Sequence, residues 1–223
     1  MATTTLTVSE NNDNGRFFRN LVSIGSDPAS CPGSFNGITQ NYTNLIGANY
    51  DDEEIAHNWA AVYFRFQSVA IDQGTTISSA FLKSHITYLT GTGDFLIAAI
   101  DTDDAPQPTA AFQGNKTSYT TAQVTYSSIA VAAPHTSPDI KTVIQEIVDR
   151  AGWSSGNDIT IVVYVNSVGA SSSRLANFGR LADSKAAQLE IETPGGGSTR
   201  KQSLTMTDPS MGVQGLGNNF TLE

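Results

Sequence analysis

One stretch of the chain carries a helical pattern of apolar residues, and almost every other patterned stretch alternates as a strand does. In the helical stretch the apolar residues recur at spacings of three and four, which puts them on one face of a helix. They are Ile140, Val143, Ile144, Ile147 and Val148. Ser137 suits the N-cap, Pro138 the first helical position and Gly152 the end. The sequence therefore predicts one amphipathic helix over about residues 138–150.

The rest of the pattern predicts short β-strands. Residues 62–66 and 80–88 alternate with the period of two of a half-buried strand. Residues 159–165 are apolar on both faces, which is typical of a central strand. Further strands are predicted at 3–8, 17–24, 95–100, 122–129, 174–178 and 187–191, and in the 80–88 strand Ala80, Leu82, Ile86 and Tyr88 are expected to share one face. At least eight strands at this spacing, with one helix crossing an end, predict an all-β fold, a jelly-roll-type β-sandwich.

Two segments break the pattern. Residues 25–54 contain scattered prolines, glycines and aromatic residues without a sustained period, and predict a long loop insertion that is functional or ordered by a partner. After Thr193 a Pro-Gly-Gly-Gly hinge leads into a polar segment with isolated apolar residues. These are Leu204, Met206, Met211, Val213, Leu216, Phe220 and Leu222. The chain is therefore expected to form a domain at 1–193, followed at 194–223 either by a disordered terminus or by an extended arm that makes inter-subunit contacts.

Charge and composition narrow the range of partners. The chain has 12 Lys and Arg against 21 Asp and Glu, for a net charge of −9. Nucleic-acid backbones and anionic membranes both require a basic patch, so we expect neither as a partner. The first residues lack the features of a secretory signal, and no stretch approaches the roughly 18 apolar residues of a membrane span. Cys31 is the sole cysteine, so no intrachain disulfide can form.

The sequence offers one literal catalytic motif, in the wrong context. Residues 152–156 match G-x-S-x-G, but a nucleophile elbow has a strand before its serine and a helix after it, and here the predicted order is reversed. His57, His85 and His135 lie far apart without metal-ligand spacing, and are expected to be surface or edge histidines. We therefore expect no catalytic residue and a protein that is not an enzyme.

Two other groups of side chains are candidates for binding. Asp101 and Asp103 follow the 95–100 strand, and carboxylates at a loop end can hold a structural Ca²⁺, although EF-hand spacing is absent and a solvated acidic loop is the alternative. Exposed aromatic rings can stack on sugars, although aromatic residues at alternating strand positions more often fill the core. The aromatic candidates are Trp59, Tyr63, Tyr119 and Tyr126. The residues of a glycan site stay unknown from sequence.

Three runs of sequence resemble one domain family. IQEIVDRAGWSSGNDITIVVY at 144–164 resembles a motif of β-sandwich, carbohydrate-binding-module-like domains that occur in secreted bacterial proteins and in tailed-bacteriophage sequences. AVYFRFQSVAIDQGTTISSAFL at 61–82 resembles the early strand pair of the same family, and DTDDAP at 101–106 resembles its middle acidic loop. The resemblance covers about residues 60–192, and departs from the family at the 25–54 insertion and after Thr193.

The resemblance implies a non-enzymatic structural protein of a tailed-bacteriophage virion, such as a capsid decoration (cement) protein or another head- or tail-attached protein. Its partners would be a major capsid or tail protein and further copies of this chain, as a homo-oligomer and, from phage symmetry, a trimer. The alternative is a carbohydrate-binding module or host-surface adhesin that recognises a host glycan. No cofactor is implied beyond the candidate calcium ion.

Overall fold

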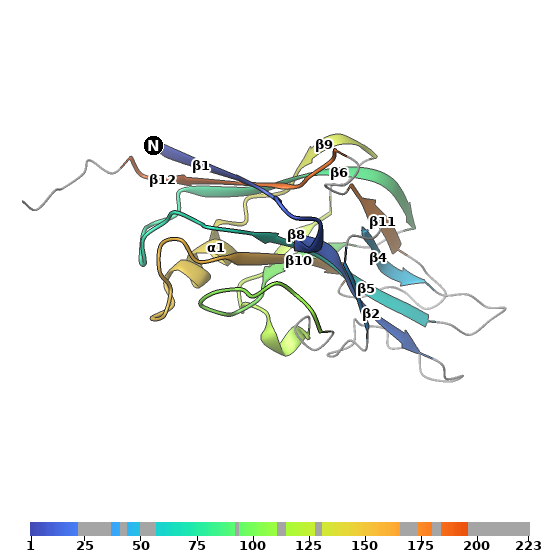
Figure 1. Ribbon diagram of the computed structural model, residues 1–223. Helices are drawn as coiled ribbons and strands as arrows, with labels where there is room; N and C mark the ends of the chain where they lie inside the picture. Colours follow the sequence, from blue (N-terminus) through green and yellow to red (C-terminus); the bar gives the residue numbers. More distant parts are fainter. Residues whose placement is uncertain are drawn as a thin grey trace, which may run out of the picture.

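The described part of the chain folds as an antiparallel β-sandwich with one short helix (Figure 1). The computed structural model describes residues 1–21, 37–40, 44–49, 57–91, 94–110, 115–127, 131–165, 174–179 and 184–195. The strands are β1 (Ala2–Thr7), β2 (Asn14–Leu21), β3 (Gly37–Gln40), β4 (Asn44–Asn49), β5 (His57–Phe66), β6 (Ser79–Gly91), β7 (Phe95–Ala99), β8 (Val124–Tyr126), β9 (Ala132–Thr136), β10 (Ile159–Val165), β11 (Arg174–Phe178) and β12 (Gln188–Thr193). The helix is α1 (Lys141–Val148), and two 3₁₀ turns are η1 (Asn11–Asp13) and η3 (Lys116–Ser118).

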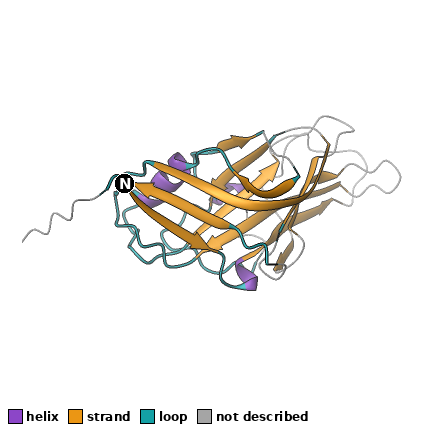
Figure 2. Ribbon diagram, turned by 90° about the horizontal axis from the view of Figure 1, so that it is seen from above, coloured by secondary structure: helices purple, strands orange, loops and turns teal. Residues whose placement is uncertain are grey.

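Strand β6 connects the two layers of the sandwich. Its first half pairs with β12 on one side and β9 on the other, and its second half pairs with β11. From β11 the ladder continues through β4, β5, β10 and β7 to β8, and β1 lies beyond β12. β2 pairs with β5, and β3 pairs with β2. The strands are therefore paired in one continuous series. This series folds over so that two layers of strands face each other (Figures 1 and 2). The expectation of an all-β sandwich with one short helix is confirmed.

The core lies between the layers and is centred on β10. All seven residues of β10 are buried, and the strand pairs with β5 on one side and β7 on the other, so the prediction of a central strand is confirmed. In β5, Tyr63 is buried as fully as Val62 and Phe64, so this strand is covered on both faces and not on one as predicted. Phe64 also contacts the ring of Phe178 across the core, with centroids 5.7 Å apart.

The helix is where the pattern predicts it, but it begins later. Its apolar stripe is buried as expected. Ser137 does not cap it, because its hydroxyl accepts the N–H of Leu82 in β6 at 2.9 Å and donates to the carbonyl of Pro138. The carboxylate of Asp139 accepts the N–H of Lys141 at 2.9 Å, near the helix start. Residues 137–139 thus tie the chain to β6, and the helix spans eight residues.

The face of Tyr88 differs from the prediction because β6 contains an irregularity. In the pairing with β11, Ile86 lies opposite Phe178 and Tyr88 lies opposite Asn177, which leaves Thr87 as an extra residue. A one-residue shift exchanges the two faces of a strand. Tyr88 is accordingly 50% exposed, while Leu89 packs against the core.

Several predictions concern segments with a different or undescribed structure. The 25–54 segment was expected to be a loop, yet it contains β3 and β4, and β9 was not predicted. The seven apolar residues of the expected arm, from Leu204 to Leu222, lie outside the described residues, as does Cys31. Within the described ranges, no helix has the length and apolar character needed to cross a membrane.

A buried tyrosine predicts how stability depends on alkaline pH. Burial raises the pKa of Tyr126 to about 12, whereas a tyrosine in an unfolded chain ionises near 10. Ionisation therefore favours the unfolded chain between about pH 10 and 12, and stability that is complete below pH 10 is lost across this window. We expect urea denaturation at pH 9, 10 and 11 to show a smaller loss in Tyr126→Phe than in wild type. Parallel losses in the two proteins would contradict this assignment.

Candidate functional site

The acidic loop after β7 is bound to the loop that precedes β10. The N–H of Ala105 donates to the carbonyl of Asp158 at 3.0 Å, and the N–H of Asp158 donates to the carboxylate of Asp104 at 2.9 Å. The side-chain amide of Asn157 donates to the carbonyl of Asp103 at 2.9 Å. Contacts of this kind along successive residues fix the path of the loop at one end of the sandwich.

The guanidinium of Arg150, just after α1, holds the first part of this loop. Its Nε donates to Asp103 at 2.7 Å, and its Nη1 pairs with Asp101. The hydrogen bond to Asp103 is the main cause that raises the pKa of Arg150. A side chain on Gly152 would collide with this arrangement, since an added Cβ would lie 2.6 Å from the Cγ of Asp103. A larger residue at 152 would therefore have to displace the Asp103 carboxylate from its position beside Arg150.

The two carboxylates proposed to bind calcium come together, and the cation between them is an arginine. Within the described ranges, no group of three Asp, Glu, His or Cys side chains is arranged to hold a metal ion. Arg150 already supplies positive charge to both Asp101 and Asp103. The arrangement thus explains the acidic cluster through an ion-pair network, with calcium as the competing hypothesis.

A metal-dependence measurement separates these two explanations. If Arg150 is the only cation that the loop needs, the melting temperature should be the same, within about 1 °C, in excess chelator and in millimolar Ca²⁺. A bound structural calcium ion would stabilise the folded state by mass action and raise the melting temperature as its concentration rises. Differential scanning fluorimetry of the full chain is sufficient. A calcium-dependent increase that is lost in Asp101→Asn would establish the metal site.

A second arginine, Arg65 in β5, holds the other side of the loop. Its Nε donates to the carbonyl of Ala105 at 2.7 Å, its Nη1 donates to Asp13 at 2.8 Å, and its Nη2 pairs with Asp158. Asp13 has no solvent exposure and also accepts the side-chain amide of Gln67 at 2.5 Å. The local sequence pattern does not predict this network, and its one signal is Arg65 itself, the charged residue in the otherwise apolar 62–66 strand.

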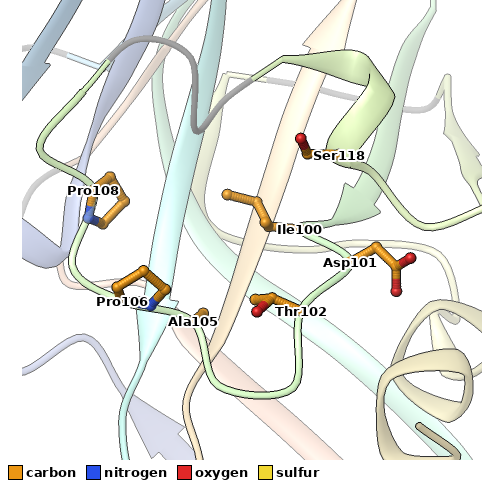
Figure 3. A pocket seen from close by; sticks show the side chains of 7 residues that line it. All are labelled: Ile100, Asp101, Thr102, Ala105, Pro106, Pro108 and Ser118. Atoms are coloured by element: carbon orange, nitrogen blue, oxygen red, sulfur yellow. The ribbon is translucent and has the colours of Figure 1, made fainter.

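A pocket of about 300 Å³ opens beside the same loop (Figure 3). It is lined by Ile100, Asp101, Thr102, Ala105, Pro106, Pro108 and Ser118. Its margins are tied together, because the N–H of Asp101 donates to the carbonyl of Ser118 at 2.7 Å and the amide of Gln40 donates to the carbonyl of Pro108 at 2.5 Å. Rigid, largely apolar walls with a few polar groups are typical of small-molecule sites.

Two comparisons with known proteins find no match. No family model matches this chain. A search of curated proteins likewise gives no relative. The resemblance of residues 60–192 to phage and secreted β-sandwich domains therefore stays a prediction.

The aromatic residues considered for sugar binding are mostly inside the protein. Tyr63, Tyr119 and Tyr126 are buried, so none of the three presents a ring face to solvent, and the side chain of Trp59 lies outside the described part. These three residues fill the core, as the alternative interpretation predicted.

Of the histidines, His135 lies with its Nδ1 2.6 Å from the hydroxyl of Tyr126, and the side chain of His85 is partly buried.

The G-x-S-x-G match is a turn between α1 and β10. The indole N–H of Trp153 donates to the carbonyl of Ile71 at 2.9 Å, and the ring is buried. Ser154 is exposed, and its carbonyl accepts the N–H of Asn157 at 3.0 Å. A helix precedes and a strand follows, so the predicted reversal of the nucleophile-elbow order is confirmed.

Proposed function

We propose that this protein is a non-enzymatic structural component of a tailed-phage particle, a capsid decoration protein or another head- or tail-attached protein. It would stabilise the particle by binding further copies of itself and neighbouring virion proteins. The jelly-roll connectivity and the C-terminal arm belong to the same proposal. Support comes from the resemblance above and from a sandwich whose end loops are held by Arg65 and Arg150.

The observation that carries this proposal is the place where the C-terminal segment begins. β12 pairs with β1 up to Thr193, and an added Cβ on Gly195 would lie 2.8 Å from the backbone nitrogen of Met1. The chain continues for 28 residues beyond Gly195. This segment starts close to the end of β12, beside the first residue of the chain. At about 3.3 Å per extended residue, a segment of this length can span roughly 90 Å. It is therefore long enough to reach a neighbouring subunit.

The composition of the segment suits weak, repeated adhesion. Each docked apolar side chain would contribute on the order of 1–2 kcal/mol before the cost of ordering the segment is subtracted. Many copies of such a contact on one particle give avidity that a single contact lacks.

The experiment compares the full chain with a variant whose seven apolar tail residues, from Leu204 to Leu222, are changed to serine. We expect the variant to lose particle binding or higher-order assembly and to keep the wild-type melting temperature, because the sandwich core is untouched. Light scattering gives the mass, and circular dichroism gives the melt. A chain truncated after Thr193 should behave in the same way. Unchanged assembly in both variants would reject the arm.

The second candidate function is carbohydrate recognition, and the pocket beside Pro106 and Pro108 is the observation that favours it. Thr102 and Ser118 supply hydroxyl groups at its wall. Glycan-array binding that Thr102→Trp abolishes and the exposed Thr121→Trp preserves would support this function. Failure of the wild-type chain to bind any glycan on the array would count against it.

A further inference from the structure

Strand β1 leaves one of its edges unpaired within the described part of the chain, where it pairs with β12 alone. The N–H of Val8 donates to the carbonyl of Ala187 at 3.0 Å, which continues the register in which Leu6 lies opposite Leu189. In an antiparallel ladder the hydrogen-bonded positions alternate. The backbone groups of Thr3, Thr5 and Thr7 therefore point away from β12, toward the open edge.

This edge lacks the features that usually prevent strands from pairing with other chains. Protected edges are short, irregular, charged or interrupted by proline. Among the described strands with an open edge, β8 has three residues, β3 has four, and β9 contains Pro134. β1 has six residues, no charged residue, no proline and no break in its register. The side chains of Thr3, Thr5 and Thr7 are exposed.

We propose that β1 pairs with β1 of a second copy, antiparallel about a two-fold axis at Thr5. In this register Thr5 lies opposite Thr5 of the second copy, and Thr3 lies opposite its Thr7. Thr3, Thr5 and Thr7, whose backbone groups point toward the open edge, then all belong to hydrogen-bonded pairs within the two β1 strands. No other two-fold register of β1 with itself pairs as many of these backbone N–H and C=O groups. The inference rests on the proposed function in that it names the surface and the partner of one inter-subunit contact.

A second copy fits this edge better than an unrelated strand for two reasons. The chain carries a net charge of −9, so two copies repel each other unless they meet through uncharged surface, and β1 provides such a surface. The edge is also self-complementary, because threonine faces threonine in every hydrogen-bonded pair of this register, and such cross-strand pairs are favourable. A two-fold contact predicts even numbers of copies, whereas the phage resemblance implies a trimer.

Cysteine cross-linking tests the register directly, in the full chain with Cys31→Ser. Residues in a hydrogen-bonded antiparallel pair have Cα atoms about 5.5 Å apart, within the range of a disulfide. Thr5→Cys should therefore give a covalent dimer under mild oxidation. Thr3→Cys is the matched control, since two such residues would lie about 13 Å apart along the strand, beyond disulfide reach. Mixing Thr3→Cys with Thr7→Cys should restore cross-linking. Equal cross-linking of the two single variants, or none, overturns the proposed pairing.

Proline at residue 5 tests the contact without a cross-link. Thr5→Pro removes an N–H that points outward and leaves the ladder with β12 intact, whereas Thr5→Val keeps that N–H. We expect the dimer dissociation constant to rise at least ~10-fold in Thr5→Pro and to change little in Thr5→Val, with melting temperatures near that of the wild-type monomer. If Thr5→Pro assembles as the wild type does, the β1 contact is wrong. If the seven-serine tail variant loses assembly in the same experiment, the proposed function still stands. A wild-type chain that stays monomeric and does not bind particles would reject both.

Discussion

Replacing Arg65 with methionine is expected to lower the free energy of unfolding by about 3–5 kcal/mol, because it leaves a buried carboxylate without its counter-ion. The side chain of Arg65 is 13% exposed, and that of its partner Asp13 is 0% exposed. Arg65 also pairs with Asp158 and binds the carbonyl of Ala105, so its loss releases the acidic loop from the sheet. Equilibrium urea denaturation followed by circular dichroism measures the change.

Lys83→Met is the matched control, since it breaks an ion pair of another kind. Lys83 and Glu190 are 33% and 26% exposed, and a pair so accessible to water is worth about 1 kcal/mol or less. Adding Asp13→Asn to Arg65→Met should recover part of the loss, because the uncompensated charge is then removed. Similar losses of unfolding free energy in Arg65→Met and Lys83→Met would show that the buried ion pair stabilises the protein no more than the exposed one.

Trp153→Ala is expected to cost about 3–5 kcal/mol of stability through the cavity that it leaves in the core. The indole is buried, and its N–H satisfies the carbonyl of Ile71, so the substitution also strands a buried acceptor. The neighbouring exposed Ser154→Ala should change stability by less than about 0.5 kcal/mol. Chemical denaturation of the three proteins side by side is the measurement. A large loss of stability in Ser154→Ala with a small loss in Trp153→Ala would contradict the conclusion that Trp153, and not Ser154, stabilises the fold at this turn.

The local sequence pattern predicted the elements whose burial is uniform along their length. The helix was found because burial of one face leaves an apolar repeat, and β10 was found because burial of both faces leaves an unbroken apolar run. β3 and β4 were missed because they are only four and six residues long and lie in a segment without a clear alternation. The face of Tyr88 was wrong because the irregularity at Thr87 arises from pairing with β11, a partner that the local pattern of β6 does not encode.

The candidate site was predictable only in part for the same reason. The cluster of Asp101 and Asp103 was visible, but its counter-ion, Arg150, is 47 residues away from Asp103. Arg65 is joined to Asp13 across 52 residues and to Asp158 across 93. Charge pairs at such separations are created by the order of strands in the sheet, and a single sequence does not state that order. The acidic loop therefore suggested calcium before the fold supplied two arginines.

The position of β12 determines how the protein would respond to tension on its C-terminus. β12 lies between β1 and β6, is antiparallel to both, and ends at Thr193. A pull on the C-terminus directed along the axis of β12 would load the hydrogen bonds on both sides in shear, all at once. Strands pulled in that direction resist as a group, whereas a pull across the ladder would unzip it one bond at a time. If the C-terminal arm holds neighbouring subunits as proposed, β12 would anchor it against a pull along its axis.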